Sequence, residues 1–201
     1  MDKREFLEYK GISPFPQDFD TFWDKEIKKA DIHFENELVY ELTEKNFNIS
    51  FARCYNLYFN SIGNAKIYSK MIVPANIKGK IPFLLIFHGY QGQSSDWSKY
   101  MGYVASGMGI VLMDVRGQAG KSQDNTIFDG MTVRGHIIRG IKEGREKLFY
   151  KNVFLDTYLL SKIVEEFDYA DKARISVFGE SQGGALSVVC AALNPNIRKS
   201  L

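Results

Sequence analysis

The 201-residue sequence predicts an α/β fold with a mostly parallel sheet and an antiparallel hairpin at its N-terminal side. Two observations carry this prediction. The first half of the chain has two stretches in which apolar and polar residues alternate, as in strands with one buried face. The second half has continuous apolar runs separated by segments of helical periodicity, which is typical of parallel strands connected by helices.

The chain is expected to be the N-terminal part of a single domain, with a helical arm over residues 1–45 and a sheet core over residues 46–201. Within the arm, "PQDFDTFWDKEIKK" has the apolar spacing of a helix, and Asp18 stands where an N-cap is expected. Four apolar side chains fall on one face of that helix, namely Phe19, Phe22, Trp23 and Ile27.

An antiparallel hairpin is expected next. "FNISFARCYNLYFN" and "AKIYSKMIVP" both alternate, and a Gly63-Asn64 turn lies between them. One face of the first strand is expected to carry Phe47, Ile49, Phe51, Tyr55, Leu57 and Phe59.

The remaining elements are expected to alternate between strand and helix. "IPFLLIF", "GIVLM" and "RISVFG" are apolar throughout, as in strands buried on both faces. "FLDTYLLSKIVEEF" has helical periodicity with Leu155, Leu159 and Val164 on one side, and "SQGGALSVVCAAL" begins a second helix. Residues 121–151 form a long connection, a length common in lids and interaction loops.

Composition limits the class of partner and the compartment. The chain has 26 Lys and Arg against 24 Asp and Glu, so we expect neither a nucleic-acid partner nor a membrane partner. The opening "MDKREFLEYK" lacks the apolar stretch of a signal peptide, and no uncharged run reads as a membrane span. Cys54 and Cys190 lie far apart, so buried free thiols and a cytoplasmic location are expected.

The stretch "DVRGQAGKS" invites comparison with a phosphate-binding P-loop, G-x-x-x-x-G-K-[ST]. The position that must be Gly is Val115, and Gly117 precedes Gly120 by only three residues. The loop is therefore too short to surround a phosphate, and no nucleotide site is predicted. Lys121 and Ser122 are expected to be surface residues.

"VFGESQGG" is the strongest chemical signal in the chain. Residues 179–183 fit G-x-S-x-G, the nucleophile elbow, in which Ser181 would occupy a strained turn between a strand and a helix. The strand "RISVF" precedes it and a helix rich in small residues follows, as this motif requires. The alternative interpretation is a Gly-rich turn without a catalytic Ser.

A serine nucleophile needs hydrogen-bond donors for the oxyanion that develops during its attack. The backbone N–H of Gln182 lies at the start of the expected helix. A second donor usually comes from a loop after a central strand, and "FHGYQGQ" places the backbone of Tyr90 there.

None of the three histidines is expected to act as a catalytic base. His88 precedes Ser181, against the usual order of this fold, so we expect it to fix the neighbouring loop by hydrogen bonds. His33 lies near a helix end and His136 in the long connection. No ligand cluster of suitable spacing is present, and neither a metal nor an organic cofactor is predicted.

Three blocks, "HGYQG", "DVRGQAG" and "GESQGG", resemble the acetyl xylan esterase and cephalosporin-C deacetylase group of α/β-hydrolases, carbohydrate esterase family seven. "DFDTFW" and "NAKIYSKMIVP" are similar too, so the resemblance covers nearly the whole chain. The second block contains the family's R-G-Q loop, which braces the active site and here comprises Arg116, Gly117 and Gln118.

The resemblance implies a serine carboxylesterase that removes acetyl groups from acetylated sugars, such as xylo-oligosaccharides, or from cephalosporin C. Ser181 would be its nucleophile, and Tyr90 and Gln182 would supply the oxyanion N–H groups, with Tyr90 also contacting substrate. Family members assemble as hexamers, so a homo-oligomer is implied. Two alternatives stay open: a peptidase or dienelactone-type hydrolase, or a catalytically inactive module that binds carbohydrate or assembles with partners.

The sequence departs from the family at its C-terminal end. No Asp, Glu or His follows Ser181, so the acid and base of a triad are expected beyond Leu201. The outer C-terminal strands are expected to be absent, which would leave "RISVF" as an exposed edge. The 201-residue chain alone is therefore expected to be an inactive, truncated enzyme.

Overall fold

The structure, a computed structural model, describes residues 2–9, 11–127 and 137–201. Its strands are β1 (Tyr40–Lys45), β2 (Ala52–Ser61), β3 (Ala65–Pro74), β4 (Ile81–Phe87), β5 (Gly109–Met113), β6 (Ala170–Gly179) and β7 (Ile197–Ser200). Its α-helices are α1 (Lys3–Glu8), α2 (Phe19–Asn36), α3 (Met101–Ala105), α4 (Phe149–Glu165) and α5 (Gln182–Leu193). Single 3₁₀ turns cover Ile62–Asn64, Trp97–Tyr100 and Arg145–Lys147.

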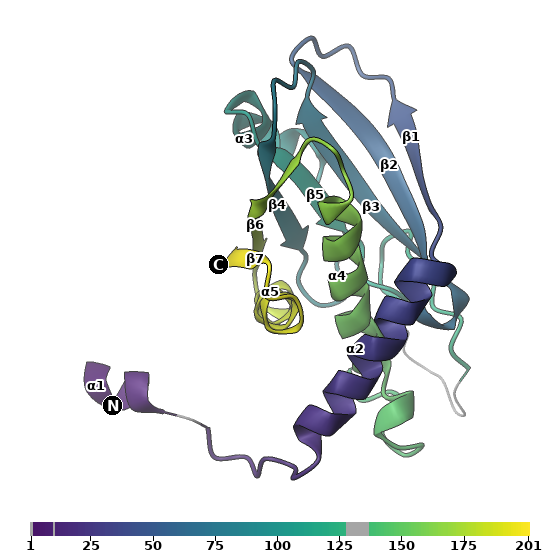
Figure 1. Cartoon of the computed structure of the whole chain (residues 1–201), viewed down its shortest axis with the longest axis vertical. Coiled ribbons are helices and arrows are strands. Elements are labelled where there is room, and N and C mark those ends of the chain that lie inside the picture. The colour runs from purple at the N-terminus through teal and green to yellow at the C-terminus, as the bar shows by residue number, and fades with distance from the viewer. Residues whose placement is uncertain (1, 10, 128–136) are drawn as a thin grey trace.

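The described strands form one seven-stranded sheet in the order β1-β2-β3-β5-β4-β6-β7 (Figure 1). Strands β5, β4, β6 and β7 are parallel to one another, whereas β1, β2 and β3 pair antiparallel and β3 is antiparallel to β5. The mixed sheet with an N-terminal hairpin confirms the predicted fold class. Because β4, β5 and β6 are parallel, the loops that follow them emerge at the same end of the sheet.

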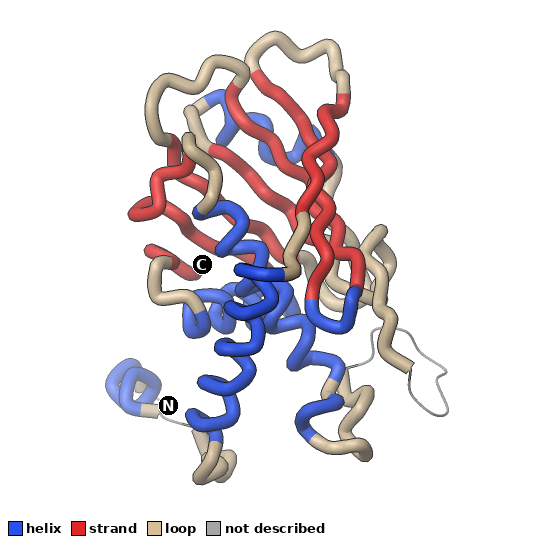
Figure 2. The backbone as a smooth tube through the Cα atoms, turned by 45° about the vertical axis from the view of Figure 1, so that its right-hand side comes forward, coloured by secondary structure: helices blue, strands red, loops and turns tan. Residues whose placement is uncertain are grey.

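Helices cover the two faces unequally, as Figures 1 and 2 show. Helices α4 and α5 pack on one face, and their side chains share the main hydrophobic core with the strands. The short helix α3 packs on the other face, where Val104 joins a smaller core with Ile72 and Leu112. The predicted helix side carrying Leu155, Leu159 and Val164 is fully buried.

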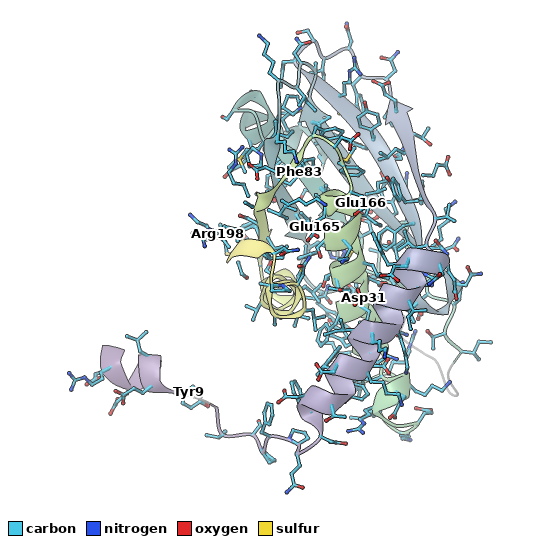
Figure 3. All side chains as sticks on the ribbon, in the orientation of Figure 1. Tyr9, Asp31, Phe83, Glu165, Glu166 and Arg198 are labelled. Carbon is cyan, nitrogen blue, oxygen red and sulfur yellow. The ribbon has the colours of Figure 1, made fainter. Side chains whose placement is uncertain are left out.

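Helix α2 packs across α4, and its last turn reaches β2. Tyr158 donates a hydrogen bond of 2.6 Å to Asp31, which lies where α2 crosses α4 (Figure 3). Lys151 forms a buried ion pair of 2.8 Å with Glu26. Asp18 precedes α2 as expected but makes no capping bond, because its carboxylate pairs with Arg145 at 2.7 Å.

The predicted hairpin is confirmed. Gly63 and Asn64 turn the chain between β2 and β3 with φ angles of +73° and +55°. The first strand begins later than expected, at Ala52. Phe47 and Phe51 therefore lie outside the strand and are exposed. The alternating pattern in the sequence extends N-terminal to Ala52, whereas backbone pairing with β3 begins only at Ala52.

The expectation of a helical arm over residues 1–45 was wrong in part, because β1 lies inside it. This strand forms one edge of the sheet, where Leu42 is partly buried against the core and the ring of Tyr40 contacts Phe167. A strand with five exposed positions gives little periodic signal, which explains why the sequence did not reveal it. The described segment before α2 includes α1 and Tyr9, which lie away from the sheet and the helices packed on it (Figures 1 and 3).

The expectation that "RISVF" is an exposed edge was also wrong. Residues 175–177 of β6 pair in parallel with β7, so β7 forms this edge of the described sheet. Three of the four residues of β7 are exposed, and Arg198 projects from it (Figure 3). Such a short polar strand was not recognisable from its sequence pattern.

Both cysteines, Cys54 and Cys190, are buried free thiols, as predicted. Among the helices of the described ranges, none is both long and apolar enough to cross a membrane.

Candidate active site

The G-x-S-x-G segment, residues 179–183, forms the sharp turn between β6 and α5 that the motif predicts. Ser181 has φ +56° and ψ −121°, a conformation that a residue with a side chain rarely adopts, and it is exposed. A Cβ at Gly179 would lie 2.2 Å from the carbonyl carbon of Gly183, and a Cβ at Gly183 only 2.0 Å from the carbonyl oxygen of Phe87. The two glycines therefore let the turn close against β4, with the Ser hydroxyl outside.

The 88–92 loop lies against this turn. A Cβ at Gly89 would be 3.9 Å from the Cβ of Ser181, so the residue before Tyr90 packs against the turn. Within the described part of the chain, the backbone N–H groups of Tyr90 and Gln182 donate to no protein acceptor. The two expected oxyanion donors thus belong to the residue after Ser181 and to the residue after Gly89, and both N–H groups lack a protein acceptor, as an oxyanion site requires.

His88 fixes this loop from behind. Its Nε2 accepts a 2.9 Å hydrogen bond from the N–H of Val115, so the proton is on Nδ1, which donates to the carbonyl of Gly89 at 2.7 Å. Burial lowers the pKa of His88, which keeps the ring neutral. Because both ring nitrogens are occupied, His88 has the expected structural role and is not available as a base.

The R-G-Q loop follows β5, and its arginine is fully buried. Arg116 makes a bidentate ion pair with Asp156 on α4, at 2.7 and 2.6 Å, and donates to the carbonyl of Ile62 at 3.2 Å. Burial disfavours the charged guanidinium, but attraction and hydrogen bonds from Asp156 outweigh this and raise the pKa of Arg116. Gly117 turns the loop with φ +64°, a backbone angle that suits glycine.

Gln118 connects the R-G-Q loop to both parts of the site. Its amide pairs reciprocally with that of Gln182, with bonds of 2.7 and 3.0 Å. Its oxygen also accepts the backbone N–H of Gln91 at 3.0 Å. The sequence did not identify a further member of this network, Tyr150, whose hydroxyl donates to the Gln182 side chain. A tyrosine at the start of a helix carries no motif, so only its tertiary position shows the contact.

The segment that resembled a P-loop closes on a carboxylate of the chain itself. The N–H of Lys121 donates to Asp114 at 2.7 Å, and a Cβ at Gly120 would lie 2.1 Å from the same carboxylate. The expectation that Ser122 lies on the surface was wrong. Its buried hydroxyl accepts the N–H of Tyr68 at 2.8 Å and donates to the carbonyl of Asp114 at 2.6 Å. Lys121 is exposed as expected, with its ammonium over the ring of Tyr68.

Of the other histidines, only His33 lies within the described residues, and it takes no part in the site. His33 is in the last turn of α2, where its Nε2 contacts the carbonyl of Asn60 at 3.1 Å. His136 lies outside the described residues. Among the residues that the structure describes, no group of three or more His, Cys, Asp or Glu side chains could hold a metal ion.

A pocket of about 310 Å³ adjoins the 88–92 loop and has room for part of a small ester. Its lining includes the apolar side chains of Ile86 and Phe178 and the polar groups of His88, Lys99 and Glu180. The described residues thus bring together a strained serine and two free amide N–H groups, and the pocket is lined by their neighbours Gly89 and Glu180 rather than by Ser181 itself. This combination suits nucleophilic attack on a carbonyl group.

Comparison with known proteins shows the family to which the chain is related. All residues, 1–201, match the acetyl xylan esterase (AXE1) family. The solved acetyl xylan esterase 1 from Thermoanaerobacterium sp. JW/SL YS485 is 42% identical with a TM-score of 0.90, covering 98% of this chain and 61% of that one. The acetyl xylan esterase from Paenibacillus sp. R4 is 25% identical with a TM-score of 0.87, covering 98% and 62%.

The acetyl esterase Axe7A of Xylanibacter ruminicola is 25% identical over 196 residues, which are 94% of this chain and 43% of that protein. The chain thus spans less than two thirds of the length of these relatives. On the match over its full length, the chain belongs to the acetyl xylan esterase family and has the α/β-hydrolase fold.

Proposed function

We propose that this protein is a serine carboxylesterase that removes acetyl groups from acetylated sugars, xylo-oligosaccharides among them. The observation that carries the proposal is the strained Ser181, exposed beside the free N–H groups of Tyr90 and Gln182. Family membership supports it, because the similar solved structures are acetyl xylan esterases. No described feature favours cephalosporin C over other acetyl esters.

In the proposed reaction the Ser181 hydroxyl oxygen attacks the acetyl carbonyl carbon. The resulting oxyanion accepts hydrogen bonds from the N–H groups of Tyr90 and Gln182. The tetrahedral intermediate collapses with release of the sugar alcohol, which takes up the proton lost by the hydroxyl. Water then attacks the acetyl-serine in the same way and releases acetate.

A general base must take the serine proton in the first step. Of the histidines that the structure describes, His88 is fully engaged and His33 is bonded to the carbonyl of Asn60 on β2. We therefore expect residues 1–201 by themselves to be a poor esterase, since loss of a triad member typically costs roughly 10⁴-fold or more.

The experiment is a comparison of substrates with the natural protein. Acetate release from acetylated xylo-oligosaccharides should exceed cleavage of a peptide amide or a dienelactone by a large factor, and should continue in the presence of a metal chelator. Hydrolysis of peptide or lactone alone would favour the rival hydrolase functions. Carbohydrate binding without any turnover would favour an inactive module.

We further propose a cytoplasmic location and assembly into a homo-oligomer. The two buried free thiols support a reducing compartment, and the resemblance to hexameric family members supports assembly. Light scattering on the purified natural protein tests the second proposal. A mass of six subunits would support it, and a monomer would contradict it.

A further inference from the structure

Tyr150 links the helix α4 to the first turn of α5, which starts next to Ser181. Its hydroxyl donates to the side-chain oxygen of Gln182. Its ring is held by aromatic neighbours on the same helix, Phe149 at 5.8 Å and Phe154 at 5.6 Å between ring centres. The contact thus joins a half-buried ring, packed between two aromatic neighbours, to the residue that follows Ser181.

The hydrogen bonds that start at Tyr150 have a fixed direction. The Gln182 oxygen accepts from Tyr150 and from Gln118, so its amide nitrogen must turn to the other side, where it donates to the carbonyl of His88 at 3.3 Å. The Gln118 oxygen accepts from Gln182 and from the N–H of Gln91. An amide oxygen accepts two such bonds, so both glutamine oxygens are saturated.

A flip of the Gln182 amide would set its oxygen against the carbonyl oxygen of His88, where neither atom can donate a hydrogen bond. The Tyr150 hydroxyl stays protonated throughout the neutral pH range, so it remains a hydrogen-bond donor to Gln182. Burial, with a smaller contribution from the nearby Tyr90, raises the pKa of Tyr150 to about 12.

We propose that Tyr150 is a positioning residue for the oxyanion site. Through the side chains of Gln182 and Gln118 it holds the backbone N–H of Gln91, and this keeps the adjacent Tyr90 peptide aimed at the same point as the N–H of Gln182. Among the described residues no hydrogen bond joins Tyr150 to Ser181, so we assign it no contact with the reacting atoms. The inference rests on the proposed function, because an oxyanion site has meaning only if Ser181 attacks a carbonyl.

The test replaces Tyr150 by Phe, which removes the hydroxyl and keeps the ring. Tyr158→Phe is the matched control, because Tyr158 is on the same helix and loses an equivalent bond to Asp31, on the side facing α2. Amide hydrogen exchange of the natural protein, followed by NMR, reports on the N–H of Gln91. This exchange should become roughly fivefold faster in Tyr150→Phe, the equivalent of one neutral hydrogen bond, and stay unchanged in Tyr158→Phe.

Turnover of an acetyl ester is the second measurement. Tyr150→Phe should lower kcat by roughly fivefold with KM nearly unchanged, whereas Tyr158→Phe should keep both constants. Unchanged exchange at Gln91, or equal effects of the two variants, would overturn the proposal. If the wild-type protein shows no esterase activity, the proposed function fails by itself, and the exchange measurement still decides whether Tyr150 orders the loop.

Discussion

The Arg116–Asp156 pair is the most deeply buried ion pair of the described residues and the main anchor of the R-G-Q loop. Both side chains are at most 1% exposed, and Ser61 donates a further hydrogen bond to Asp156. Because the guanidinium bonds the carboxylate bidentately and also reaches the carbonyl of Ile62, the loop is tied to α4 and to the hairpin turn at once. Because Gln118 is only two residues after Arg116, this anchoring also holds the backbone of Gln118 in place.

Arg116→Ala should lower the free energy of unfolding by about 3–5 kcal/mol, because it leaves the Asp156 carboxylate buried without its partner. Urea unfolding measures this. Arg174→Ala is the control, since Arg174 pairs with Asp171 at the same distance of 2.7 Å on the surface and should cost less than about 1 kcal/mol. Equal costs for the two variants would contradict the anchoring role.

His88 should make stability depend on pH. Its pKa is lowered by burial, so the unfolded chain binds this proton more readily than the native protein. The free energy of unfolding should therefore be constant above the ordinary His pKa of about 6.5 and fall as pH drops below it. Thermal unfolding between about pH 7 and 5.5 should show this slope in the wild type and a smaller one in His88→Asn. The same slope in both proteins would refute the assignment.

At the scale of elements, the turn between β6 and α5 depends on where small residues stand. Gly183 faces the backbone of β4, whereas Gly184, the next residue, would place a Cβ 3.3 Å from the carbonyl oxygen of Gly179. A side chain at position 183 would fit only if the central strand β4 moved. A side chain at position 184 needs a shift of only a few tenths of an ångström.

Gly183→Ala should therefore destabilise the protein by more than about 3 kcal/mol or prevent folding, as overpacking against rigid backbone does. Gly184→Ala should cost less than about 1 kcal/mol, helped by the higher helix propensity of Ala. Circular dichroism during thermal unfolding compares the two. Similar melting temperatures would mean that the turn is not packed against β4 as described.

The same elements show how far the sequence could be interpreted. The buried strands β4, β5 and β6 and the helix α4 were predictable, because continuous apolar runs and helical periodicity arise directly from burial. The strands β1 and β7 were not, since only one residue of each is even partly buried. Within the site, Ser181 was recognisable from the constraints of a tight turn. Tyr150 and the buried Ser122 act through contacts that only the folded chain creates.

At the scale of the whole molecule, the parallel part of the sheet assembles the site. The 88–92 loop, the R-G-Q loop and the 179–183 turn follow β4, β5 and β6, so they meet at one end of the sheet. Helix α4 supports two of them from the core, through Asp156 and Tyr150. The N-terminal hairpin contributes a second support at Ile62. Segments from most of the chain thus hold one serine and two N–H groups in place.

The most direct test of this account is the effect of Ser181→Ala on hydrolysis of a small acetyl ester by the natural protein, combined with fluorophosphonate labelling. Activity should fall by roughly three powers of ten or more, the label should be lost, and the melting temperature should change little. Ser106→Ala, at the exposed end of α3, is the control and should keep activity and labelling. Retention of more than about a tenth of the activity by Ser181→Ala, or labelling of another serine, would contradict the assignment of Ser181 as the nucleophile.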